Sequence, residues 1–128
     1  MAEMSNYLEN TLGNAVLRGS SYTSPTTIYV GLFTNDPQDD NSGTEVSGGG
    51  YARQSVTFGA PTDGLFTSNA DVSFPQATAT LGTITHIALF DALTGGNQLF
   101  HSPLDIAKLV ETGDIFSIGS GQLTVRFE

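Results

Sequence analysis

The residues whose chemistry could support catalysis are the two histidines, His86 and His101, which stand among many serines and aspartates. A nucleophilic hydrolase needs one histidine between a serine and an acid that orients the ring. The chain has no G-x-S-x-G sequence, which would present a serine on a sharp strand-to-helix turn. A metal site on the two histidines needs a third ligand, and the spacing singles none out. The sequence therefore predicts no catalytic residue and no enzyme activity.

Four acids lie in one polar segment, NDPQDDNSGTEVSGGG, and carboxylates are the ligands that calcium prefers. An EF-hand loop has alternating acids, glycine at its sixth position and glutamate at its twelfth. Counted from the first aspartate, the glycine and the glutamate fall two positions away from those places, so the match fails. Acids also cap turns readily. We therefore expect a solvated loop with no metal and no cofactor, containing Asp36, Asp39, Asp40 and Glu45.

Two further kinds of site are not supported by the residues present. A glycosidase uses two carboxylates across a cleft, and acids are plentiful, but the chain has no tryptophan to form a sugar platform. The triplet at 48–50, Gly-Gly-Gly, lacks the lysine and the serine or threonine that complete a phosphate loop. The triplet leads into an alternating segment, which favours a flexible entry or a bulge in a strand.

One segment, residues 4–18, has the spacing of an amphipathic helix. Leu8, Leu12, Ala15 and Val16 recur at helical intervals and share a face. Ser5 is a suitable N-cap, and the glycine after Arg18 is expected to end the helix. Two interpretations stay open: the helix covers one open end of a β core, or it docks on a neighbouring subunit.

The rest of the chain alternates apolar and polar residues between glycine-rich and proline-rich turns, which is typical of short strands. This pattern predicts an all-β fold with a short N-terminal helix: a single-domain antiparallel β-sandwich or jelly roll that spans residues 1–128. In the strand at 26–34 both faces are apolar, so that strand is expected to be central. The expected strands are residues 26–34, 51–58, 71–74, 83–91, 98–102, 115–118 and 122–127, with a further short one at 108–110.

Charge and composition exclude several partners. The net charge is −9, from 13 acids against four lysines and arginines. Nucleic-acid binding relies on cations that replace the counterions of phosphates, so neither DNA nor RNA is an expected partner. No run approaches the ~20 apolar residues that span a bilayer, and the acidic N-terminus does not resemble a signal peptide. The absence of cysteine fits synthesis in a reducing host cytoplasm.

Three blocks of the sequence, VSGGGYARQSVTF at 46–58, NADVSFP at 69–75 and THIALFDALTGGNQL at 85–99, carry a resemblance to known proteins. The order and amino-acid sequence of these blocks resemble those of a family of small tailed-phage virion proteins. Members of that family are often labelled tail fibre protein, and some are capsid cement (decoration) proteins. The resemblance covers the chain from Tyr7 to about Phe127. It implies a structural role for Arg53 of the GGGYAR string, which would pair with a local acid or with backbone carbonyls.

The resemblance and the lack of catalytic residues together predict a non-enzymatic phage structural protein. Our first hypothesis is a capsid cement protein that binds the outer surface of the major capsid protein lattice as a dimer or trimer. It would stabilise the lattice by mass action. The alternative is a tail-associated protein with tail-protein partners, and a glycan-binding β-sandwich is a third. The expected partner contacts lie on the helix face and in the acidic loop: Leu8, Leu12, Val16, Asp36, Asp39, Asp40 and Glu45.

Overall fold

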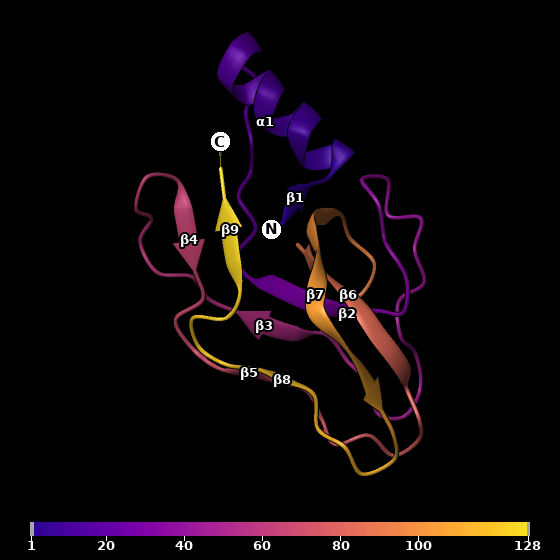
Figure 1. Cartoon of the computed structure of the whole chain (residues 1–128). Helices are drawn as coiled ribbons and strands as arrows, with labels where there is room; N and C mark the ends of the chain where they lie inside the picture. Colours follow the sequence, from indigo (N-terminus) through magenta and orange to yellow (C-terminus); the bar gives the residue numbers. More distant parts are fainter. Residues whose placement is uncertain (1, 128) are drawn as a thin grey trace.

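A computed structural model describes residues 2–127 and contains one helix and nine strands (Figure 1). The elements in chain order are β1 (Glu3–Met4), α1 (Asn6–Arg18), β2 (Ile28–Phe33), β3 (Gln54–Val56), β4 (Leu65–Thr67), β5 (Val72–Ser73), β6 (Gly82–Phe90), β7 (Gln98–Val110), β8 (Ser117–Ile118) and β9 (Thr124–Arg126). The strands are antiparallel throughout, which confirms the predicted all-β sandwich class with one short N-terminal helix.

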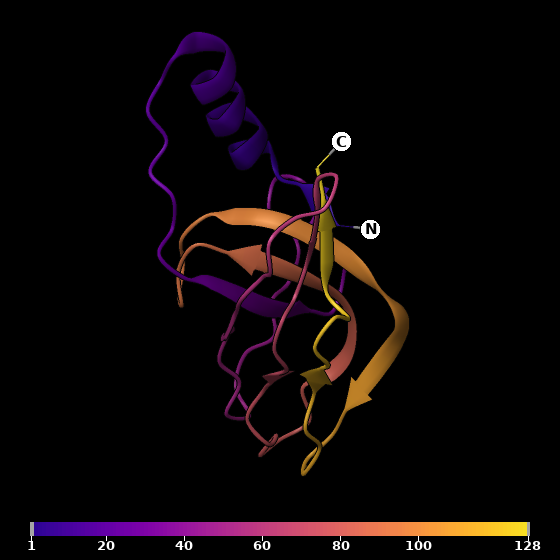
Figure 2. The same cartoon turned by 90° about the vertical axis from the view of Figure 1, so that its left-hand side faces the viewer.

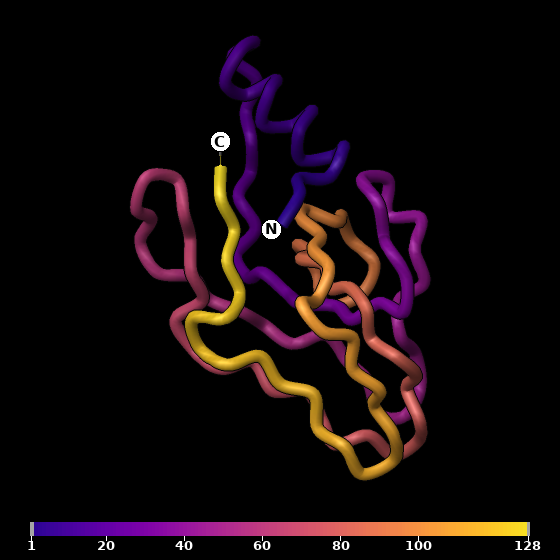
Figure 3. The backbone as a smooth tube through the Cα atoms, viewed as in Figure 1, coloured from indigo at the N-terminus to yellow at the C-terminus, as the bar shows by residue number. Residues whose placement is uncertain are grey.

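The main sheet has five strands in the order β1-β7-β6-β2-β3. The other four described strands form two two-stranded ribbons, β4-β9 and β5-β8. The long β6–β7 hairpin arches over one side of the molecule (Figure 2). The backbone trace shows the β5 and β8 segments running side by side beneath it (Figure 3). A register shift between Ile84 and His86 interrupts the hairpin ladder, and such a bulge increases the local bend of a strand.

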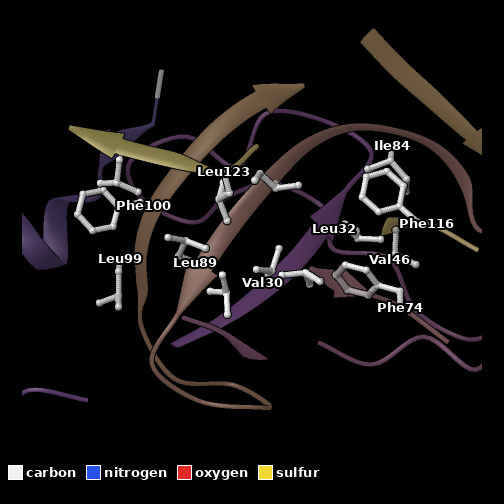
Figure 4. Packing of buried hydrophobic residues seen from close by; sticks show 14 of the residues in the cluster. Val30, Leu32, Val46, Phe74, Ile84, Leu89, Leu99, Phe100, Phe116 and Leu123 are labelled. Atoms are coloured by element: carbon white, nitrogen blue, oxygen red, sulfur yellow. The ribbon is translucent and has the colours of Figure 1, made fainter. Parts of the chain in front are cut away.

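The core lies between the inner face of the main sheet and the two ribbons. Val30 and Leu32 of β2 are fully buried and pack with Ile84 and Leu89 of β6 (Figure 4). On the opposite face of the sheet, Phe33 stacks on Phe90 with ring centroids 6.0 Å apart. Side chains on both faces of β2 are therefore buried. The strand also lies between β3 and β6 in the sheet, which confirms that it is central.

The two caps of the helix are the residues that the sequence indicated. Ser5 is the N-cap, and its Oγ accepts a hydrogen bond from the amide of Leu8 at 3.2 Å. Gly19 adopts a left-handed conformation with φ of 71° at the C-cap, which glycine reaches without steric cost. The expected helix started two residues too early, because Glu3 and Met4 form β1 and pair with His101 and Phe100 of β7.

Several predicted strands differ from the observed ones. The expected strands at 98–102 and 108–110 are parts of one strand, β7, although Pro103 lies inside it. Proline is tolerated there because β1 pairs only with the first part of β7, so Pro103 lies on a free edge and needs no amide donor. The short strands β1 and β4 were not predicted; both have two or three residues, too few to show an alternating pattern.

Candidate assembly surfaces and polar clusters

Arg53 forms the centre of a buried polar cluster with Glu45 and Tyr51. Its guanidinium donates from Nε to Glu45 Oε2 at 2.9 Å and from NH2 to Glu45 Oε1 at 2.8 Å, which is a bidentate ion pair. The NH1 group donates to the carbonyls of Ala92 and Gly95 at 2.9 and 2.8 Å. Arg53 is only 8% exposed, and its Cζ lies 3.6 Å from the centre of the Phe90 ring. The predicted structural role of Arg53 is confirmed.

The tyrosine of the same string completes this cluster. Tyr51 donates its hydroxyl hydrogen to Glu45 Oε2 at 2.6 Å and accepts from the amide of Leu32 at 3.0 Å. Burial, with a smaller contribution from the Glu45 hydrogen bond, raises the pKa of Tyr51 above its ordinary value. A Cβ on Gly31 would lie 2.9 Å from Glu45 Oε2, so glycine leaves room for the carboxylate. The cluster fastens the loop before β3 to β2 and is structural.

The second polar cluster surrounds His101, a 4% exposed residue of β7. Its Nε2 lies 2.7 Å from Asp39 Oδ1 and 3.8 Å from Glu3 Oε2. Its Nδ1 lies 3.7 Å from Asp36 Oδ1. The cluster lines a solvent-open cavity of about 360 Å³ to which Asp40 also contributes. Three of the four loop acids thus gather around a histidine, whereas Glu45 points to Arg53 instead.

Neither histidine has the neighbours of a hydrolytic site. His86 is half-buried, and its Nδ1 lies 2.8 Å from Thr85 Oγ1. Among residues 2–127, no hydrogen bond joins a serine hydroxyl to a histidine ring. The described geometry therefore provides no serine nucleophile for either ring.

An apolar groove of about 440 Å³ lies between α1 and the β4-β9 ribbon. Leu8 and Leu12 line it from the helix, and Phe58, Phe66 and Phe127 line it from the opposite side. Figure 2 shows that α1 stands out from the strands and joins them through the segment that follows it. Among the residues that line the groove, most of the side chains are aliphatic or aromatic, so the groove offers apolar surface to a partner.

The outer half of β7 forms a second accessible surface. Beyond His101 no described strand pairs with the outer edge of β7, although the strand continues to Val110. A cavity of about 380 Å³ separates this edge from the segment around β8. Ile106 and Leu109 are 76% and 56% exposed there. An edge strand with free backbone groups and exposed apolar side chains is a template for pairing with another chain.

The structure separates the residues that were expected to contact partners. Leu8 is buried in the core, Leu12 is half-buried in the groove, and Val16 is 78% exposed near the end of α1. The edge of β7 was not among the expected contacts, because its pairing partners depend on distant segments. One sign of this exposed side chain is present in the sequence: Ile106 is apolar and lies outside the predicted strands.

Within residues 2–127, no helix is both long and apolar enough to cross a bilayer. The described residues thus form a small antiparallel β domain with two polar clusters and with apolar surfaces that stay open.

Comparison with known proteins identifies the family. A family model described as "Podophage GP4 fiber I protein gp80" matches residues 3–126. The chain belongs to this family of podophage fibre proteins, which confirms the predicted resemblance to phage virion structural proteins. A sequence search of curated proteins found no match.

Proposed function

We propose that the protein is a non-enzymatic subunit of a fibre on the exterior of a podophage virion. The family to which the chain belongs supports the fibre position. The observation that carries the proposal is the pair of open surfaces, the apolar groove under α1 and the free edge of β7. Isolated proteins normally cover or charge such surfaces. In an assembled fibre, neighbouring subunits or adjoining virion proteins would cover them.

The two surfaces suit different kinds of contact. The free edge of β7 has backbone donors and acceptors along residues 104–110, beyond Pro103, and would accept an extended strand of a neighbour. The groove has an apolar lining and would accept an apolar side-chain cluster of an adjoining virion protein. The net charge of −9 opposes non-specific association before assembly. A closed homo-oligomer, a dimer or trimer, is still the assembly that we expect when copies of the chain contact one another.

Capsid cement protein, our first hypothesis from the sequence, is the second candidate. The resemblance seen in the sequence favours it, because some members of the resembling family are capsid cement proteins. A cement protein would use the same open surfaces to bind the coat-protein lattice. The two candidates differ in the partner and in the number of copies, and both require no chemistry from the protein.

Charged substitutions in the two surfaces test the proposal. We expect Leu12→Lys in the groove and Ile106→Lys on the β7 edge each to lower incorporation into virions by about tenfold or more. An unpaired charge buried in an apolar contact costs more than about 1.4 kcal/mol, the free energy that corresponds to a tenfold change in affinity. Incorporation is measured by quantitative mass spectrometry of phage grown with the variant as its only source of this protein.

Ser47→Lys introduces the same charge at an exposed loop position and serves as the control. It should incorporate as the wild-type protein does. Circular dichroism of each purified variant establishes that the fold is kept. Normal incorporation of both surface variants would contradict the assignment of these surfaces to assembly.

A further inference from the structure

The cluster around His101 brings three ligating groups together from three separate segments. Glu3 comes from β1, Asp39 from the loop after β2, and His101 from β7. One ligand atom from each lies within 4.8 Å of the other two. Asp39 and His101 are 62 residues apart in the chain. The convergence is therefore a product of the fold and not of a local sequence motif.

The charges of this cluster are not balanced by a lysine or arginine. Glu3, Asp36 and Asp39 all lie within 4 Å of the one imidazole ring. Among residues 2–127, the ion pair made by a lysine or arginine joins Arg53 to Glu45, which belong to the other polar cluster. The three carboxylates are 48–70% exposed, so water screens part of their mutual repulsion, and a cation bound between them would remove more of it. This excess of negative charge around the ring, together with the ligand spacing, favours a bound cation.

The ring is placed as a metal-binding histidine is placed. Its Nε2 faces two carboxylates, and its Nδ1 faces a third, that of Asp36. A histidine that binds a metal through one nitrogen commonly directs the other nitrogen to a carboxylate, which fixes the ring orientation. The burial of the ring keeps it in that orientation, while the exposed carboxylates border a solvent-open cavity through which an ion can enter.

We propose that Glu3, Asp39 and His101 bind one divalent transition-metal ion of the Zn²⁺ class. Three protein ligands of the nitrogen and oxygen type with water in the fourth position are a known zinc coordination. Calcium is disfavoured because it takes six to eight oxygen ligands and avoids imidazole. In the bound state Nε2 would be the unprotonated ligand atom, and the ring hydrogen would be on Nδ1, which faces Asp36.

The ion would add a further link among three segments. β1 has two residues and pairs with β7 at two positions. The loop that carries Asp39 is joined to β7 by the hydrogen bond from Gln98 Nε2 to the Gln38 carbonyl at 2.6 Å, and to the start of α1 by the Asn6 amide. A metal ion bound to all three would hold the N-terminal strand and the acidic loop against β7. This proposal replaces the expectation of no metal, which considered the loop acids and the two histidines separately and did not include Glu3.

The test is titration of chelator-treated protein with Zn²⁺, followed by calorimetry and by thermal unfolding. We expect one equivalent to bind per chain and saturating Zn²⁺ to raise the melting temperature by about 5 °C or more, because a ligand that binds only the folded state stabilises it. His101→Asn and Asp39→Asn should abolish both effects.

Asp40→Asn is the matched control, since Asp40 lines the same cavity but is not one of the three ligands. It should bind Zn²⁺ as the wild type does. Asp39→Asn alters an exposed side chain and should fold, so the result does not depend on the His101 variant being stable. No binding by the wild type, or equal binding by wild type and Asp39→Asn, would overturn the proposal.

Discussion

Replacement of Arg53 by alanine is expected to lower the free energy of unfolding by about 3–5 kcal/mol, the range for breaking a buried ion pair from one side. The variant would leave Glu45 without its bidentate partner and the carbonyls of Ala92 and Gly95 without their donor. Urea denaturation followed by circular dichroism measures the change. The large value is expected because Arg53 is 8% and Glu45 25% exposed, so water replaces the lost guanidinium only in part.

Two other arginine variants set the scale for this result. Arg53→Lys keeps the positive charge but lacks the planar fork, so its loss of stability should be smaller than that of Arg53→Ala yet still measurable. Arg18→Ala changes an exposed arginine in the last turn of α1 and should cost well under 1 kcal/mol. Equal stability of Arg53→Ala and Arg18→Ala would show that the cluster does not hold the fold.

Phe90→Ala is expected to cost a similar amount, about 3–5 kcal/mol, as large-to-small changes of buried aromatic residues do. Phe90 is 1% exposed, stacks on Phe33 and lies under the guanidinium of Arg53. The variant would leave a cavity and remove the ring that supports the arginine. The same denaturation experiment measures the loss.

Because Phe90 touches Arg53, the two substitutions should not be additive. The double variant Arg53→Ala with Phe90→Ala is expected to be more stable than the sum of the single losses predicts, since residues in contact share part of their interaction energy. Phe66→Ala, in the groove on the opposite side of the core, should combine additively with Arg53→Ala. Additivity of the Arg53 and Phe90 changes would contradict the contact between them.

Local signals in the sequence predicted the elements well where the determinants are close together. Ser5 and Gly19 bound the helix through capping interactions with their own neighbours. The alternation at 26–34 and 83–91 marked the two central strands, because their side chains face a core on both sides or on one. The predicted break between the strands at 98–102 and 108–110 was wrong, since β7 runs through both. Whether a proline such as Pro103 interrupts a strand depends on which edge is paired, and that depends on distant segments.

The polar clusters were less predictable, for the same reason. The GGGYAR string singled out Arg53, yet its partners Ala92 and Gly95 lie about 40 positions further on. In the sequence the acidic loop is one group of four carboxylates. In the structure Glu45 pairs with Arg53, whereas the other three acids lie around the cavity beside His101. No spacing rule joins residue 3 to residues 39 and 101, since only the pairing of β1 with β7 brings them together.

The number of copies per virion, relative to the major coat protein, tests the proposed function most directly. Quantitative mass spectrometry of purified virions supplies this ratio, and cryo-electron microscopy of the same particles shows where the copies lie. A fibre subunit should be present in far fewer copies than the coat protein and should be located at the tail. A ratio near that of the coat protein, with density over the capsid lattice, would contradict the fibre assignment and support the cement protein.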